Sequence, residues 1–267
     1  MTKSIRQLLG LSGRQRSPRI PSGRRIYAIG DIHGRLDLFE ALLEAIERDD
    51  REAPKAKSTV ILLGDLVDRG PDSAGVIKRA RKLQKGRDTR VLAGNHEEMF
   101  LLSFDRKDVL RHFLRFGGRE TLRSYGINQR PKNKKDLEAL QRQMKELIPR
   151  KDVKFIREME DRVTIGDYAF VHAGILPKVK LADQSPVDLR WIREPFLSSE
   201  VRHSHIIVHG HTIYNKPELR ENRIGIDTGA FASGRLTALV LEGTGRRFIE
   251  TRVKKGVITT RARKAEL

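Results

Sequence analysis

Six side chains that could bind metal ions each follow a short apolar run of the sequence. They are carboxylates, imidazoles and one carboxamide, namely Asp31, His33, Asp65, Asn95, His172 and His211. Ligands of these types, without sulfur, suit Mn²⁺, Fe or Zn²⁺ better than Ca²⁺ or a closed structural zinc site. If they are divided between two ions that share a bridging carboxylate, each ion keeps two or three further protein ligands and room for water. Such a pair of ions, about 4 Å apart, activates water and clamps the oxygens of a phosphoryl group.

Short strands are expected to position the first of these side chains. The apolar runs 26–29, 59–63 and 89–92 each end in a glycine-containing polar turn. Segments with helical periodicity follow them, at 36–46, 73–86 and 98–104. This repetition predicts a βαβαβ unit with a parallel sheet, in which right-handed crossovers place all three turns at the same carboxyl edge. Open α/β sheets bind their ligands at that edge.

A helical insert and a strand-rich half are predicted for the rest of the chain. The insert spans about 105–160 and has helical segments at 109–116, 121–125, 137–148 and 149–158. Its dense lysines and arginines are either a solvated face or a basic cap that attracts an anionic substrate. The strand-rich half contains a predicted hairpin at 162–165 and 168–171, a short helix or turn at 187–192, and strands at 206–208, 223–226, 236–241 and 248–253. One α/β domain with two sheets accounts for all of these segments.

The composition restricts both the partners and the metal ligands. The 267 residues carry a formal net charge of +19, which favours anionic partners such as phosphates, phosphoproteins or nucleic acid. There is no cysteine, so disulfides and thiolate metal sites are excluded. No apolar run of 18 residues occurs, and we expect a cytoplasmic protein. We expect a flexible basic arm at 1–24, the domain at 25–256 and a basic tail at 257–267.

Five motifs occur in a characteristic order: GDIHG (30–34), GDLVDRG (64–70), GNHE (94–97), HAG (172–174) and HGHT (209–212). Together they resemble the metal-dependent phosphoprotein phosphatase family within the calcineurin-like phosphoesterases, and its compact bacterial and bacteriophage branch most of all. The similarity runs from about residue 26 to residue 243. It implies a two-sheet metallophosphoesterase sandwich with α-β-β-α layers and a helical insert.

The resemblance implies a role for each matching residue. The first ion would be held by Asp31, His33 and Asp65. The second would be held by Asp65, Asn95, His172 and His211, with Asp65 as the bridge. We expect Mn²⁺ in both places, with Fe or Zn²⁺ as alternatives.

The resemblance also implies catalytic and phosphate-binding residues. Asp68 and His96 match the catalytic dyad of the family. Asp68 is expected to orient the imidazole and raise its pKa, so that His96 protonates the leaving oxygen. Arg69 and Arg193 match phosphate-binding arginines, and Asn95 is expected beside them. His209 has no ligand role in the family pattern, and we expect it to pack behind the ligands.

The leading functional hypothesis is a phosphoprotein (Ser/Thr) phosphatase, in which a metal-bridged hydroxide attacks a phosphomonoester in line. The alternative is a symmetrical bis(5′-nucleosyl)-tetraphosphatase or a related hydrolase of nucleotide or RNA 5′-polyphosphates. Its pattern resembles GDLVARG with GNHD, so Asp68 and Glu97 favour the phosphatase. A non-enzymatic nucleic-acid binder is disfavoured by the intact ligand set. The sequence leaves the physiological substrate and the oligomeric state open.

Overall fold

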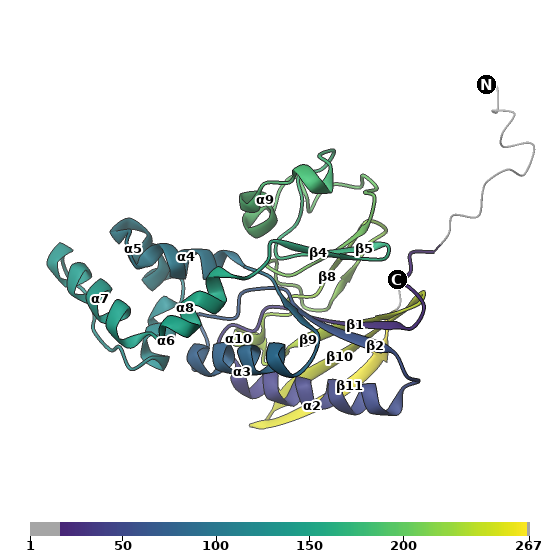
Figure 1. Ribbon diagram of the computed structural model, residues 1–267, viewed down its shortest axis with the longest axis horizontal. Coiled ribbons are helices and arrows are strands. Elements are labelled where there is room, and N and C mark those ends of the chain that lie inside the picture. Colours follow the sequence, from purple (N-terminus) through teal and green to yellow (C-terminus); the bar gives the residue numbers. More distant parts are fainter. Residues whose placement is uncertain (1–16, 266–267) are drawn as a thin grey trace, which may run out of the picture.

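The computed structural model describes residues 17–265, which form two β-sheets with helices around them (Figure 1). The first sheet has the strand order β11-β10-β9-β1-β2-β3, and the second has the order β4-β5-β6-β8-β7. The strands of the first sheet are β1 (Arg24–Ile29), β2 (Lys57–Leu62), β3 (Thr89–Val91), β9 (Thr237–Glu242), β10 (Gly245–Lys254) and β11 (Val257–Lys264). Those of the second are β4 (Arg162–Ile165), β5 (Tyr168–Val171), β6 (Ile206–His209), β7 (Glu218–Leu219) and β8 (Arg223–Gly225). The predicted α/β fold with two sheets is confirmed.

The expected βαβαβ unit forms the middle of the first sheet. Strands β1, β2 and β3 are parallel neighbours. The helices that follow them are α2 (Leu36–Glu52), α3 (Ser73–Gly86) and α4 (Asn95–Ser103). Helix α4 begins three residues earlier than its periodicity suggested, because the Glu97 side chain accepts the Gly94 N–H and caps the first turn. Asn95 and His96 therefore lie in the first turn of a helix.

Strand β1 is buried on both of its faces. Ile26 and Ala28 point into the core between the two sheets, whereas Tyr27 and Ile29 point into the core beneath the helices. Successive side chains of a strand alternate between faces, so a strand covered on both sides needs apolar residues at every position. Burial on both faces holds the carboxyl end of β1, and the loop that follows it, in a fixed place.

The helical insert lies to one side of the sheets (left in Figure 1). It contains α5 (Lys107–Arg115), α6 (Gly118–Ser124), α7 (Lys134–Leu147) and α8 (Arg150–Arg157). Its apolar side chains, among them Phe113 and Leu140, belong to the same buried cluster as Phe39 of α2. The insert therefore continues the main hydrophobic core. After the β4–β5 hairpin, which is confirmed, come a short 3₁₀ helix (Leu181–Asp183), α9 (Pro186–Trp191) and α10 (Ala230–Ser233).

The C-terminal segment differs from our expectation of a basic tail beyond the domain. Val257–Lys264 is the edge strand β11, paired in antiparallel register with β10 along its whole length. The two strands are joined through Lys255 and Gly256, which both have positive φ (49° and 78°). Two positive φ angles in a two-residue loop match the twist of a tight hairpin. This strand is held by backbone pairing and is largely exposed, so its sequence lacks the continuous apolar run of a buried strand.

The expected N-terminal arm lies only partly within the described residues. Residues 1–16 are outside them. The following residues are packed against the domain: Ile20 is fully buried, and its N–H donates to the Gly243 carbonyl oxygen at 2.8 Å. The Arg19 N–H donates to the Asp167 carboxylate at 2.8 Å. The expectation of a flexible arm is therefore wrong for residues 17–24. None of the helices between residues 17 and 265 is long and apolar enough to cross a membrane.

Candidate active site

The five predicted loops follow the carboxyl ends of strands in both sheets, and they meet where the two sheets adjoin. Two groups of side chains there have ligand atoms within 4.8 Å of one another. One group is His33, Asp65 and His96, and the other is Asp65, His172 and His211. Asp65 belongs to both groups, as a bridging carboxylate would.

Asn95 joins the second of these groups. Its Oδ1 lies 3.1 Å from His172 Nε2 and 2.9 Å from His211 Nδ1. His172 Nδ1 donates to the Leu63 carbonyl oxygen at 2.8 Å, so the neutral ring carries its lone pair on Nε2. That lone pair faces Asn95 Oδ1 and, at 3.4 Å, Asp65 Oδ1. Acceptor atoms that face one another with no proton between them fit a bound cation.

The first group is arranged in the same way, with an arginine beside it. His33 Nδ1 donates to the Val67 carbonyl oxygen at 2.8 Å, and His33 Nε2 lies 3.4 Å from Asp65 Oδ2. Arg69 donates to His33 Nε2 and to His96 Nε2, both at 3.0 Å. Arg69 therefore reaches both imidazoles of this group, and its guanidinium also lies over the Phe231 ring.

Asp31 lies beside the two groups but belongs to neither. It is buried, and its two oxygens accept the His211 N–H at 3.2 and 3.0 Å. Burial raises the pKa of Asp31, and repulsion from Asp227 and Asp65 adds to the rise. A carboxylate buried beside other carboxylates gains from a nearby cation.

The protonation states suit metal binding. Burial lowers the pKa of all three predicted ligand imidazoles: that of His33 well below its ordinary value, that of His172 to about 4 and that of His211 to about 2. Burial also raises the pKa of Asp65 to about 6. Metal ions bind neutral imidazoles and ionised carboxylates. A divalent cation would also offset the free-energy cost of burying these carboxylates without a counter-ion. The residues present therefore fit a site for divalent metal ions.

The loops adopt a backbone conformation that non-glycine residues rarely take. Positive φ angles occur at His33 (45°), Asp65 (50°), Asp68 (74°), Arg69 (69°) and His211 (61°). Such conformations cost of order 1–3 kcal/mol each and persist where the surroundings enforce them. Five of the predicted site residues therefore share this strained conformation, which is typical of active-site loops.

Glu97 supplies much of that enforcement, and the sequence did not reveal its role. Its side chain is fully buried. Oε2 accepts the N–H groups of Asp65 (2.8 Å) and Gly94 (2.9 Å), and Oε1 accepts those of Leu66 (2.7 Å) and Val67 (3.3 Å). One carboxylate thus ties the loop after β2 to the loop after β3.

The Asp68–His96 pair is present and well supported. His96 Nδ1 lies 2.5 Å from Asp68 Oδ2, and the Thr121 hydroxyl donates to Asp68 Oδ1 at 2.6 Å. The Asp68 N–H donates to the hydroxyls of Thr121 and Ser73. We expected the pKa of His96 to be raised. Burial instead lowers this pKa, and the attraction of the Asp65 carboxylate, which acts to raise it, is too weak to compensate. Thr121, on the insert helix α6, had no motif that could have identified it.

Two further residues complete the surroundings of the site. Asp227 is buried, accepts the Gly229 N–H at 2.8 Å and raises the pKa of Asp31. Its Asp-Thr-Gly sequence after an apolar run was a signal to which we gave no role. His209 packs edge-on against Phe196, with ring centroids 5.1 Å apart, behind the ligand loops.

A pocket of about 450 Å³ opens onto these groups. Its polar lining includes Asp65, Arg69, Asn95, His96, Arg193 and His211. Its lining also includes the apolar or aromatic side chains of Met99, His112, Phe116, Trp191 and Ile213. Arg193 is held by Thr212 Oγ1 at 3.0 Å and by the His211 carbonyl oxygen at 3.3 Å. Phe116 and Ile213 are 43% and 49% exposed, so they offer apolar contact area to a ligand.

Two sheets that carry a His/Asp cluster with a shared carboxylate are the fold and site of a metallophosphoesterase. The chain belongs to the calcineurin-like phosphoesterase family, whose model matches residues 24–232. This family uses a pair of divalent metal ions, and the two groups around Asp65 could hold them.

Several curated relatives are named as dinucleoside tetraphosphatases. The asymmetrical bis(5′-nucleosyl)-tetraphosphatase PrpE of Bacillus mycoides (strain KBAB4) is 29% identical over 237 residues, which cover 79% of this chain and 88% of that protein. The symmetrical bis(5′-nucleosyl)-tetraphosphatase of Acidovorax sp. (strain JS42) is 33% identical over 57% of this chain. The chain spans only 45% of the length of that relative. A symmetrical bis(5′-nucleosyl)-tetraphosphatase of Hamiltonella defensa subsp. Acyrthosiphon pisum (strain 5AT) is 44% identical over 27% of this chain, which covers 23% of that relative.

Solved structures share the fold. A crystal structure described as that of a candidate diadenosine tetraphosphatase matches with a TM-score of 0.59 and 20% identity, over 92% of this chain and 98% of the other. A cold-active protein tyrosine phosphatase matches with a TM-score of 0.56 and 17% identity, over 91% and 81% of the two chains. At these identities the matches show the common fold alone.

Proposed function

We propose that this protein hydrolyses a phosphoric anhydride bond of dinucleoside polyphosphates, with dinucleoside tetraphosphates as the substrate class. The observation that carries the proposal is the composition of the active-site pocket. Arg69 and Arg193 lie on the same pocket as Phe116 and Trp191. Guanidinium groups bind phosphate oxygens, and aromatic faces stack on nucleobases, so one pocket offers contacts to both parts of a nucleotide. The names of the relatives support the same substrate class.

The position of Glu97 in the structure is compatible with this function. Its presence in GNHE, where the tetraphosphatase pattern has GNHD, favoured a phosphoprotein phosphatase. The Glu97 carboxylate is fully buried and accepts four backbone N–H groups. It is absent from the lining of the pocket. A residue that organises two loops and does not line the pocket carries little information about the substrate.

Each residue of the site receives a role in this proposal. Two divalent ions, which we propose to be Mn²⁺, would be held by Asp31, His33, Asp65, Asn95, His172 and His211. When bound, they would supply activation of water and polarisation of the phosphoryl group. Arg69, Arg193 and Asn95 bind the oxygens of the phosphate that is attacked. Water loses a proton to solvent as it forms the new P–O bond, the bridging P–O bond breaks, and the nucleotide departs as a phosphate anion. His96, oriented by Asp68 and protonated from solvent, would give a proton to a departing oxygen that needs one.

A phosphoprotein (Ser/Thr) phosphatase is the second candidate, and the Asp68–His96 contact favours it. The alkoxide of serine is a poor leaving group and needs a proton as it departs, whereas a nucleotide leaves as a phosphate anion that needs little protonation. A buried carboxylate that orients an imidazole at 2.5 Å is the equipment of a general acid. The dependence of each reaction on His96 therefore separates the two candidates.

Diadenosine tetraphosphate and a phosphoserine peptide, assayed side by side with Mn²⁺, test the proposal. We expect a higher kcat/KM for the dinucleotide. In His96→Ala we expect kcat to fall about 10²–10⁴-fold on the peptide and considerably less on the dinucleotide. Metal content is measured for each variant, and His205→Ala, remote from the site, is the control. A higher kcat/KM for the peptide would replace the proposal with the second candidate.

A further inference from the structure

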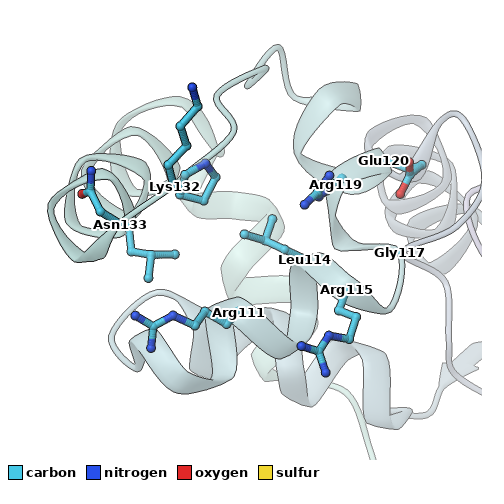
Figure 2. A pocket seen from close by; sticks show the side chains of 10 residues that line it. Arg111, Leu114, Arg115, Gly117, Arg119, Glu120, Lys132 and Asn133 are labelled. Carbon is cyan, nitrogen blue, oxygen red and sulfur yellow. The ribbon is translucent and has the colours of Figure 1, made fainter.

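A second pocket lies within the helical insert (Figure 2). This insert pocket has a volume of about 610 Å³, larger than the active-site pocket. It is lined by Arg111, Leu114, Arg115, Gly117, Arg119, Glu120, Pro131, Lys132, Asn133 and Leu137. These residues come from α5, from α6 and from the segment around the start of α7. Three elements of the insert therefore form its walls.

The insert pocket has a strong positive charge. Its lining includes Arg111, Arg115, Arg119 and Lys132 but only one carboxylate, that of Glu120. Within residues 17–265, no carboxylate lies within 4.0 Å of the charged group of any of these four basic residues, and Glu120 is paired with a fifth, Arg123. Other basic residues of the insert do have partners: Arg106 pairs with Asp108, Lys107 with Glu138 and Lys145 with Asp105. The cationic groups of the pocket are thus left available to an anion.

The floor of the insert pocket is apolar. Figure 2 shows the side chain of Leu114 extending from α5, which also carries Arg111 and Arg115, toward the segment that carries Lys132. Leu137 and Pro131 also line this space. Inorganic phosphate would use only the arginines. An apolar floor beneath a basic rim suits a ligand that has both phosphate groups and a flat apolar part, as a nucleotide has.

The insert pocket adjoins the active site through the turn between α5 and α6. Phe116 lines the active-site pocket, and the next residue, Gly117, lines the insert pocket. The Gly117 carbonyl oxygen accepts the Arg69 N–H at 3.1 Å. A Cβ on Gly117, which has φ of +110°, would lie 2.6 Å from Arg69 Cγ. On α5 itself, His112 lines the active-site pocket, while Arg111 and Arg115 line the insert pocket.

We propose that the insert pocket binds a nucleoside polyphosphate group, with its arginines on the phosphates and its apolar floor under the base. The inference rests on the proposed function for the choice of ligand. The group is either the half of a dinucleoside polyphosphate remote from the bond that is cleaved, or a separate nucleotide. Both sources present the same chemistry to Arg111, Arg115 and Arg119.

Binding of ATP to the full chain in EDTA, measured by calorimetry, tests the pocket without any dependence on activity. The double variant Arg111→Ser/Arg115→Ser removes two charges from the pocket. Its matched control, Lys82→Ser/Lys85→Ser, removes two exposed charges from α3. We expect at least a ten-fold loss of ATP affinity in the pocket variant and less than a two-fold change in the control. Both side chains in the pocket variant are exposed, so the fold is retained.

Steady-state kinetics then distinguish the two sources. If the pocket holds the remote half of the substrate, KM for diadenosine tetraphosphate rises at least ten-fold in the pocket variant, while kcat and the hydrolysis of p-nitrophenyl phosphate stay unchanged. If it holds a separate nucleotide, ATP affinity falls and KM stays constant. Unchanged ATP affinity together with unchanged KM overturns the inference, even if the dinucleotide is the substrate. Loss of ATP affinity in a protein that does not hydrolyse the dinucleotide supports the pocket and refutes the proposed function.

Discussion

Replacement of Glu97 by glutamine tests how the active-site loops are held. Glutamine has the same shape but places an NH₂ group where one carboxylate oxygen stands. Whichever way the amide turns, one pair of backbone donors keeps an acceptor and the other pair faces the NH₂ group. The pairs are the N–H groups of Asp65 and Gly94, and those of Leu66 and Val67.

The size of the effect follows from these bonds. Each buried donor left without an acceptor costs about 1–3 kcal/mol, so two lost acceptors give roughly 2–6 kcal/mol. Glutamine also removes a charge whose burial, together with repulsion from Asp65, raises the pKa of Glu97. That relief brings the expected loss of unfolding free energy down to about 2–4 kcal/mol. For a chain of this size the loss corresponds to a fall in Tm of roughly 4–16 °C.

Thermal unfolding in EDTA is the appropriate assay, because bound metal would otherwise contribute to Tm. Glu98→Gln is the matched control one residue away. Glu98 accepts from Arg190 Nη1 and Trp191 Nε1, both at 3.2 Å, at a partly exposed position. We expect the control to lose no more than about 1 kcal/mol. If Glu97→Gln and Glu98→Gln melt within about 2 °C of each other, Glu97 does not hold the loops as argued.

Three further outcomes are expected. In Gly70→Ala the new Cβ would clash with the His33 carbonyl oxygen, and we expect activity to be abolished. Gly86→Ala, which has open space around its Cβ, is the control and should keep full activity. Equal activities of the two variants would contradict the close approach of Gly70 to His33. Burial opposes ionisation of Asp49, but bonds from Arg247 and Tyr27 outweigh it and lower its pKa. Stability is therefore lost as the pH falls from about 4 through this lowered pKa, and Asp49→Asn flattens that part of an acid-unfolding curve. Chelation of divalent ions removes hydrolysis and added Mn²⁺ restores it; full activity in EDTA would refute metal dependence.

The sequence could predict the parts of the molecule that depend on local pattern. Residues 26–29 and 59–63 are continuous apolar runs, which is the pattern of parallel strands covered on both faces. Because such strands end at a common edge, Asp31 and Asp65 could be placed near one another before any coordinates were known. The motif spacing extended this prediction to His172 and His211, which lie after strands of the second sheet. Strand β11 escaped prediction because backbone pairing, which leaves no apolar pattern, holds it in place.

Interactions between distant segments were decided only by the tertiary structure. Glu97 binds the loop after β2, and Thr121 of the insert binds Asp68, although no spacing in the sequence connects either pair. The insert pocket forms where α5, α6 and the start of α7 meet. The sequence showed that this region is basic, but only the structure shows that its arginines line one pocket. The sequence alone determined which residues could bind metal ions and phosphate, because that capacity belongs to the side chains. Packing decided which of them share a carboxylate, which lie in a pocket and which hold the loops, because these properties depend on distances between residues far apart in the chain.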